Sequence, residues 1–289
     1  MTQTPEYLQS ELPAIELFQK LGYEYIKNYP RNSINEVILE DRLRASLTQI
    51  NPWLKGNSLE KVIRTIKHIQ ASTLMEANQI VHELLTKKDS ITIKPMPDSK
   101  PLPVFIIDYD SPENNDFLVV NQLTFHGAKN NSIPDIIIYI NGLPLAVIEC
   151  KSPKVAITEA ISDLQYYQEN SPKLFYYNHI SVAINKAKAL YGAIAADFNH
   201  YSKYKAESLK AVSALVDKMP TQQDILIQAF FQKTVFLDII RNFTIFEVNQ
   251  AKTIKKLPRY QQLRAVNKIL HKLKTKNQGG GSLAYNWKW

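Results

Sequence analysis

Hydrophobic positions along the first ninety residues repeat with the period of an amphipathic helix. Residues 5–21 predict one helix, which we expect to end at Gly22. The stretch NEVILEDRLRASLTQINPW predicts a second helix that ends before Pro52, and residues 58–87 predict a third. The apolar positions of the first helix are Leu12, Ile15, Leu17, Phe18 and Leu21.

From about residue 102 the pattern changes to short apolar runs separated by Asn, Gly and Pro, which is typical of β-strands. A helix over 156–169 and a strand over 179–184 follow, and a long helix around Leu226 leads to the strand FTIFEV. Another helix starts near Tyr260. The pattern therefore predicts an α/β fold with a mixed β-sheet flanked by helices. The expected strands of the middle region are PVFIIDY, DFLVVNQLTF, DIIIYI and LAVIECK.

Composition narrows the class of protein. A chain of 289 residues with 45% hydrophobic and 21% charged residues is typical of a globular protein, and its net charge of +8 is compatible with nucleic acid as a partner. Cys150 is the one cysteine of the sequence, which excludes an intrachain disulfide and favours the reducing cytoplasm. No apolar run reaches the roughly 18 residues that a membrane span needs.

Charged residues interrupt the apolar segment PDIIIYINGLPLAVIECKSP, residues 134–153. Its Asn-Gly pair predicts a tight hairpin turn between antiparallel strands. Because side chains alternate along a strand, Glu149 and Lys151 point to one face and Cys150 points to the other. A strict two-residue turn sets Asp135 opposite Ile148, on the wrong face. We therefore expect a bulge or a longer loop that moves Asp135 opposite Val147 and diagonal to Glu149, at about 7–8 Å.

Two carboxylates on one face suit a hard cation such as Mg²⁺, which would polarise a scissile phosphate and acidify a bound water. Lys151 could orient that water or stabilise the charged transition state, so that phosphodiester hydrolysis is the reaction class. The structural alternative is that Asp135 caps a strand while Glu149 and Lys151 form a solvated ion pair. Their place at the end of a purely apolar strand favours the catalytic interpretation.

The segment 111–153 strongly resembles the nuclease domain of type I restriction endonuclease R subunits, the motor and cleavage subunits of those complexes. Similar stretches cover the chain to about residue 278. They are NEVILEDRLRASLTQINP, PKLFYYN, FLDIIRNFTIFE and RYQQLRAVNKIL.

The resemblance implies a PD-(D/E)xK core in which Asp135 and Glu149 bind the metal and Lys151 is the catalytic lysine. Glu11 matches an acidic position that can reach the metal, although a solvated glutamate is an equal alternative. Two features depart from the family: Ile133 replaces its Arg, and its Gln-x-x-x-Tyr motif is present as Asp163-x-x-x-Tyr167 or, out of step, with its glutamine at Gln165. Tyr167 is therefore a weaker catalytic candidate, since a helical aromatic is more often a core residue.

The resemblance also implies a division of the chain. Residues 1–245 correspond to the nuclease domain, and residues 246–289 to the start of a truncated RecA-like motor domain with an irregular tail. Gln262 matches an adenine-reading glutamine of the family. The alternative is that it only lies on the polar face of a surface helix. No G-x-x-x-x-G-K-[ST] motif follows, so ATP is expected only for a full-length subunit and not for this chain.

These observations leave competing functions. The first is a Mg²⁺-dependent DNA endonuclease domain without its own sequence specificity, whose partners are double-stranded DNA and the methyltransferase and specificity subunits. The second is a catalytically silent fragment that docks on DNA or the methyltransferase. The third is a self-contained nuclease that cuts short duplexes unaided, in which the basic segment 252–276 would contact phosphates.

Overall fold

The computed structural model describes residues 4–96, 98–206, 208–216, 218–250 and 252–277. Residues 1–257 form one compact unit and residues 258–289 a second, of which the described part is mainly the helix α10 (Tyr260–Asn277). The expected boundary between a nuclease domain and a motor domain at residue 245 stays a prediction. The expected irregular tail falls mostly on residues 278–289, outside the described residues.

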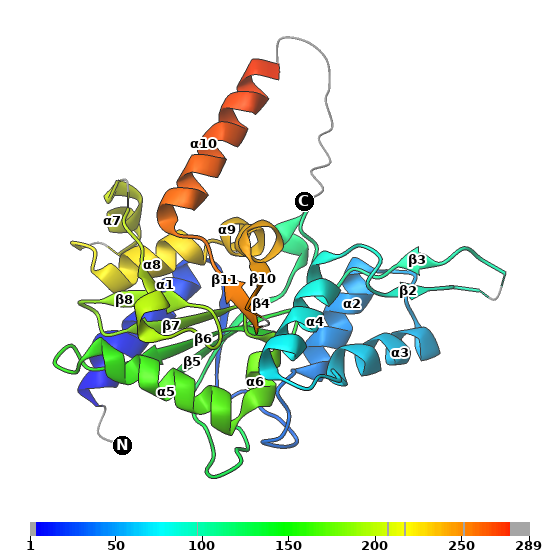
Figure 1. The fold of residues 1–289 in the computed structure, drawn as a ribbon, viewed down its shortest axis with the longest axis horizontal. Coiled ribbons are helices and arrows are strands. Elements are labelled where there is room, and N and C mark those ends of the chain that lie inside the picture. The colour runs from blue at the N-terminus through cyan, green and yellow to red at the C-terminus, as the bar shows by residue number, and fades with distance from the viewer. Residues whose placement is uncertain (1–3, 97, 207, 217, 251, 278–289) are drawn as a thin grey trace. The chain divides into compact units, whose positions relative to one another are not determined.

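A mixed sheet forms the centre of the first unit (Figure 1). Within the described residues it has seven strands in the order β1-β4-β5-β6-β7-β8-β9. The β1/β4 and β6/β7 pairs are parallel and the other pairs are antiparallel, so the predicted mixed α/β class is confirmed. The strands are β1 (Glu24–Lys27), β4 (Phe117–Asn121), β5 (Ile136–Ile140), β6 (Leu143–Cys150), β7 (Ile180–Ile184), β8 (Ala189–Gly192) and β9 (Ser202–Lys203).

Helices cover both faces of this sheet. On one face, apolar residues of α5 and α6 pack on a row that includes Ile137 and Val147. On the other face, Phe18 packs edge-on against Tyr23 and Phe231, and Tyr23 packs against Phe117 of β4. These helices are α1 (Leu12–Lys20), α5 (Ile157–Asn170), α6 (Pro172–Tyr177), α8 (Gln222–Phe230) and α9 (Lys233–Asp238). The central strands are therefore buried on both sides and their sequences are continuously apolar.

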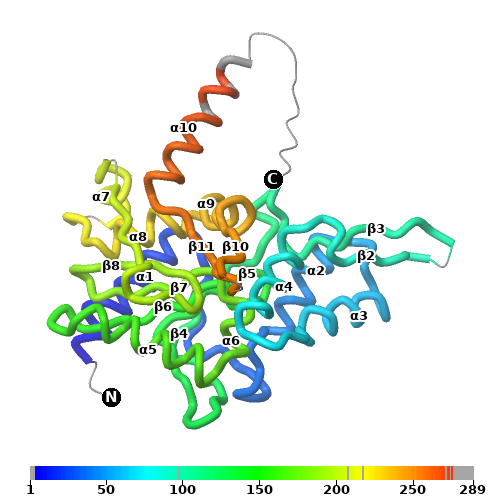
Figure 2. The backbone as a smooth tube through the Cα atoms, viewed as in Figure 1, coloured from blue at the N-terminus to red at the C-terminus, as the bar shows by residue number. Residues whose placement is uncertain are grey.

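Other elements surround this core, and Figure 2 shows the chain path through them. They are the helices α2 (Glu40–Ile50), α3 (Gly56–Lys67), α4 (Leu74–Thr86) and α7 (Lys210–Val216), the two-stranded pair β2 (Thr92–Ile93) and β3 (Leu102–Pro103), and the hairpin β10 (Ile245–Asn249) and β11 (Lys252–Lys256). Among the described residues, no helix has both the length and the apolar character needed to cross a bilayer.

Two expected long helices are interrupted. The predicted helix over 58–87 divides into α3 and α4, because Thr73 adopts an extended conformation and its side chain accepts a hydrogen bond from the Glu76 N–H. The expected helix around Leu226 breaks at Phe231, a fully buried residue in the core beneath the sheet. The first break therefore has a local cause, the Thr73 cap, and the second lies at a residue buried in the core.

The register between β5 and β6 places the central carboxylates. Ile140 pairs with Leu143, as a two-residue turn requires, but Tyr139 pairs with Pro144 while Ile138 pairs with Ala146. Leu145 is therefore an extra residue in β6, next to a proline that has no N–H for the ladder. The predicted irregularity is confirmed.

The predicted direction of the register shift between β5 and β6 is wrong. Val147 pairs with Ile137, and Ile136 pairs with Ile148, so the register continues to Asp135 opposite Glu149 rather than opposite Val147. Because directly opposed residues share a face, Asp135 and Glu149 continue the apolar row of Ile137 and Val147 towards α5.

A buried basic cluster predicts how stability depends on pH. The His82 Nδ1 lies 3.3 Å from the His179 Nε2, and the Lys255 Nζ donates a hydrogen bond of 2.8 Å to the Asn78 Oδ1. Burial, together with the smaller effect of the charges of Lys255 and Lys87, lowers the pKa of His82 to about 4. His82 is thus neutral in the folded protein at a pH where it is protonated in the unfolded chain.

We expect the free energy of unfolding to decrease as the pH falls from 6.5 towards 4, because the unfolded state then binds more protons than the folded state does. Between pH 7.5 and 5, His82 should account for about 2 kcal/mol of this loss. Urea unfolding of His82→Gln at both pH values should show a loss smaller by that amount than in the wild type. His68→Gln, at an exposed histidine, is the control. Equal losses in the wild type and His82→Gln would contradict the argument.

Candidate active site

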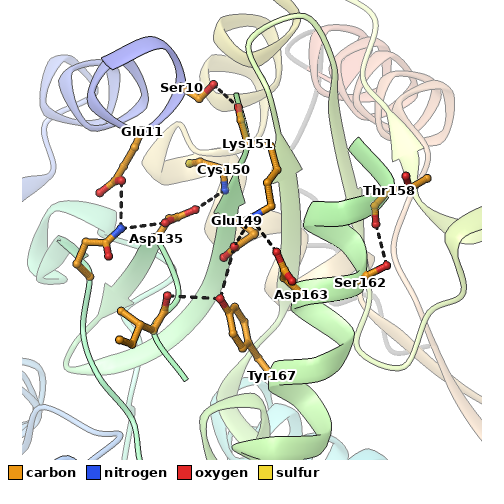
Figure 3. Close-up of polar contacts among 12 residues, drawn as sticks. Ser10, Glu11, Asp135, Glu149, Cys150, Lys151, Thr158, Ser162, Asp163 and Tyr167 are labelled. Atoms are coloured by element: carbon orange, nitrogen blue, oxygen red, sulfur yellow. Dashed lines mark hydrogen bonds and ion pairs between the residues drawn. The ribbon is translucent and has the colours of Figure 1, made fainter. Parts of the chain in front are cut away.

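The strand β6 ends at the candidate site. Figure 3 shows the carboxylates of Asp135 and Glu149 beside each other, with Lys151 reaching over Glu149 towards Asp163 of α5. Asp135 is 7% exposed and Glu149 3% exposed, so both carboxylates are largely withdrawn from water. The structure therefore brings together the three residues that the hairpin pattern singled out.

Each oxygen of Asp135 is held by a hydrogen-bond donor. The Cys150 backbone N–H donates to the Oδ2 at 2.7 Å, and the Gln122 Nε2 donates to the Oδ1 at 2.9 Å. Burial, with a smaller contribution from the charge of Glu11, raises the pKa of Asp135 to about 7 against the lowering effect of the Cys150 N–H. Asp135 therefore binds a proton readily when no cation is near.

Glu149 has one oxygen engaged and one free. Its Oε1 accepts from the Lys151 Nζ at 2.9 Å, whereas its Oε2 is buried and has no hydrogen-bond partner among the described residues. Burial raises the pKa of Glu149 well above its usual range, and the charge of Asp135 adds to the rise. An unpartnered buried carboxylate oxygen is costly unless a proton, a cation or a hydrogen-bond donor satisfies it.

Lys151 lies between two carboxylates. Its Nζ is 2.9 Å from the Glu149 Oε1 and 2.7 Å from the Asp163 Oδ2. Burial lowers the pKa of Lys151, but the charge of Glu149 and the hydrogen bond with Asp163 outweigh burial and hold the pKa above its ordinary value. The ammonium group therefore stays charged at neutral pH. Asp163 supplies a second negatively charged partner for the Lys151 ammonium group, which a neutral glutamine at this position would not supply.

The N-terminal helix brings Glu11 to the same region. A turn of π-helix, Tyr7–Glu11, precedes α1, and the Leu12 N–H donates to the Tyr7 carbonyl five residues back. Glu11 is 2% exposed, and its carboxylate accepts hydrogen bonds from Asn121 at 2.8 Å and Gln122 at 3.1 Å. Glu11 thus connects to Asp135 through Gln122, which the sequence analysis did not single out.

The remaining candidates fall in two places. The Tyr167 hydroxyl lies 3.5 Å from the Glu149 Oε1 and 3.4 Å from the Ile133 carbonyl oxygen, so Tyr167 borders the site through weak contacts. Ile133 itself is 43% exposed. Gln262 belongs to the second compact unit, where its Oε1 accepts from the Arg259 N–H at 2.7 Å at the start of α10.

Backbone contacts anchor the end of β6. The Ser10 hydroxyl donates to the Lys151 carbonyl at 2.8 Å, and the Lys151 N–H donates to the Ile184 carbonyl at 2.8 Å. The Gln223 Nε2 in turn donates to the Ser10 carbonyl at 2.8 Å. These supports come from segments more than 30 residues away along the chain, so no local sequence signal marks them.

The donor set fits a hard cation. Within the described part of the chain, no three His, Cys, Asp or Glu side chains converge into a ready-made metal site. Asp135 and Glu149 nevertheless present carboxylate oxygens beside each other, and the free Glu149 Oε2 provides an acceptor that a cation could occupy. Mg²⁺ is commonly held by one or two carboxylates together with water and phosphate oxygens, which matches this pair.

Comparison with known proteins places the chain among named relatives. The family described as "Type I restriction enzyme R protein N terminus" matches residues 3–200. The chain is 29% identical over 270 residues to the type I restriction enzyme HindI endonuclease subunit of Haemophilus influenzae, covering 89% of this chain and 26% of that protein. It is 28% identical over 262 residues to the putative type I restriction enzyme MjaIXP endonuclease subunit of Methanocaldococcus jannaschii, covering 82% of this chain and 25% of that protein.

The chain therefore belongs to the family of type I restriction enzyme R protein N-terminal regions. Its mixed sheet, with helices on both faces, is consistent with the PD-(D/E)xK-like nuclease core that the sequence resemblance implies. The chain spans about a quarter of the length of the Haemophilus and Methanocaldococcus relatives, 26% and 25% respectively.

Proposed function

We propose that this chain is a Mg²⁺-dependent endonuclease domain that hydrolyses phosphodiester bonds of double-stranded DNA without a sequence specificity of its own. The observation that carries the proposal is the buried pair Asp135 and Glu149, with a free Glu149 oxygen and Lys151 at its side. The names of the relatives, endonuclease subunits of type I restriction enzymes, support the same reaction class.

Each side chain has a role in this proposal. Asp135 and Glu149 would hold the cation, which when bound supplies polarisation of the scissile phosphate and a more acidic water. Lys151 would place its positive charge beside the phosphate oxygens, where negative charge develops during hydrolysis. Asp163 keeps that ammonium group fixed, and the Tyr167 hydroxyl borders the Glu149 carboxylate.

The partners are part of the proposal. Because the relatives are named as subunits of type I restriction enzymes, we propose that the chain works beside methyltransferase and specificity subunits, which would select the DNA. The net charge of +8 favours contact with the DNA phosphates.

Metal binding in the absence of DNA tests the site. In calorimetric titration with Mn²⁺, the wild-type chain should bind the cation, and Asp135→Ala should bind it at least about 100-fold more weakly, since even outer-shell partners contribute 10–100-fold. Asp110→Ala, at an exposed carboxylate paired with Arg241, should bind as the wild type does.

Binding of a short DNA duplex in Ca²⁺-free buffer should be the same for Asp135→Ala and the wild type. Unchanged Mn²⁺ binding by Asp135→Ala would contradict the proposed metal site. A wild-type chain that binds DNA but no divalent cation would favour the catalytically silent docking fragment instead.

A further inference from the structure

Gln122 makes contacts that the proposed reaction does not require. It follows β4 directly and has a φ of 55°, a left-handed conformation that is uncommon for residues other than glycine. Its backbone N–H donates to the Asp135 carbonyl oxygen at 3.0 Å. Strained backbone at the edge of a candidate site is a reason to look for a function.

The side chain of Gln122 joins two buried carboxylates. Its Nε2 donates to the Glu11 Oε2 at 3.1 Å and to the Asp135 Oδ1 at 2.9 Å. An amide nitrogen has two hydrogens, so this pair of contacts uses both of them. Gln122 is an exposed residue, whereas Glu11 and Asp135 are buried, so the amide reaches inwards from the rim of the site.

Glu11 is fixed independently on its other oxygen. The Asn121 Nδ2 donates to the Glu11 Oε1 at 2.8 Å, and the Asn121 Oδ1 accepts from the Tyr25 hydroxyl at 3.1 Å. Both oxygens of Glu11 therefore already have an amide donor. Both oxygens of Asp135 also have an N–H donor, so what distinguishes Asp135 is its place beside Glu149, whose Oε2 is free.

We propose that Gln122 is a positioning residue that orients Asp135 towards the cation, and that Glu11 is an outer anchor for its amide and not a metal ligand. This inference rests on the proposed function. With its Oδ2 on the Cys150 N–H and its Oδ1 on Gln122, the Asp135 carboxylate has one orientation, and a lone pair of each oxygen remains available. Outer-shell partners of this kind tune metal affinity through the ligand that they hold.

The test compares Mn²⁺ affinities without DNA, by calorimetric titration. Gln122→Met keeps the length of the side chain and removes both donors, so its dissociation constant for Mn²⁺ should rise about 10–100-fold. Gln165→Met is the matched control, because the amide of this partly exposed glutamine donates to the Ala196 carbonyl oxygen at 3.2 Å. Its dissociation constant should stay within about twofold of the wild type.

Glu11→Gln separates an anchor from a ligand. If Glu11 acts only through Gln122, the double variant Glu11→Gln, Gln122→Met should bind Mn²⁺ no more weakly than Gln122→Met alone. If the losses from the two substitutions multiply in the double variant, Glu11 acts on the cation independently of Gln122, which would overturn the assignment of its role. Gln122→Asn, which tolerates the left-handed backbone but is one methylene shorter, should repeat the loss seen with Gln122→Met.

This experiment distinguishes a failure of the positioning role from a failure of the proposed function. A wild-type chain that binds Mn²⁺, together with unchanged affinity in both Gln122 variants, would overturn the positioning role and leave the proposed function standing. A wild-type chain that binds no Mn²⁺ would overturn the proposed function, and the positioning role with it.

Discussion

Replacement of Lys151 by methionine is expected to slow DNA cleavage by at least about 10²–10³-fold at saturating Mg²⁺, the range seen when one transition-state donor is removed. The structure holds the Lys151 ammonium group between the Glu149 Oε1 and the Asp163 Oδ2, at 2.9 and 2.7 Å. Methionine has a similar length but no charge, so the packing should persist while the positive charge beside the phosphate is lost. Nicking of supercoiled plasmid measures the rate.

Binding of DNA and of Mn²⁺ should change little in Lys151→Met, because neither proposed ligand is removed. Lys87→Met is the control, since Lys87 is an exposed lysine on the C-terminal side of α4 that pairs with Glu83. Cleavage by Lys151→Met at the wild-type rate would show that the lysine only neutralises buried carboxylates. Loss of cleavage in both lysine variants would point to a general effect of charge on DNA binding.

Replacement of Gly142 by alanine is expected to lower the free energy of unfolding by at least about 3 kcal/mol, from backbone strain and overpacking together. Gly142 has a φ of 77° in the hairpin turn. An added Cβ would collide with the Leu39 carbonyl oxygen and would lie 2.7 Å from the Leu43 backbone nitrogen. The Leu39 N–H also donates to the Gly142 carbonyl at 2.9 Å, so the turn cannot move away freely.

Gly56→Ala isolates the strain from the collision. Gly56 has a φ of 55°, yet nothing lies within 4 Å of an added Cβ there. Its replacement should cost about 1–2 kcal/mol, the strain alone. Urea unfolding of the three proteins measures the difference. Equal losses in the two variants would contradict the packing of the hairpin turn against the start of α2.

The central strands β4 to β7 were predictable because they carry strong local signals, whereas β1, β8 and β9 were not predicted and the expected strand PVFIIDY is a strand only at Pro103. The apolar runs around Ile138 and Val147, separated by Asn141 and Gly142, identify two adjacent antiparallel strands without any knowledge of the rest of the fold. The helix break at Thr73 was missed although Thr73-x-x-Glu76 is a local N-cap signal. The break at Phe231 had no such signal, because Phe231 is buried against distant elements.

The candidate site was predictable only in part. A bulge was expected because Asp135 and Glu149 must share a face, but its position at Leu145, and hence the opposed pairing, depends on the strand geometry beside Pro144. The role of Asp163 could have been suggested by its position four residues before Tyr167. Gln122 had no signal, because its contacts with Glu11 and Asp135 join three separate segments of the chain.

The central claim is that Asp135 and Glu149 hold a divalent cation beside Lys151. Diffraction from crystals soaked in Mn²⁺, recorded at a wavelength where manganese scatters anomalously, tests it most directly. We predict one anomalous peak within about 2.0–2.3 Å of an oxygen from each carboxylate, the range for a small divalent cation, with the Glu149 Oε2 among its ligands. Absence of any peak there at saturating Mn²⁺, with the Glu149 Oε2 still buried and unpartnered, would contradict the claim.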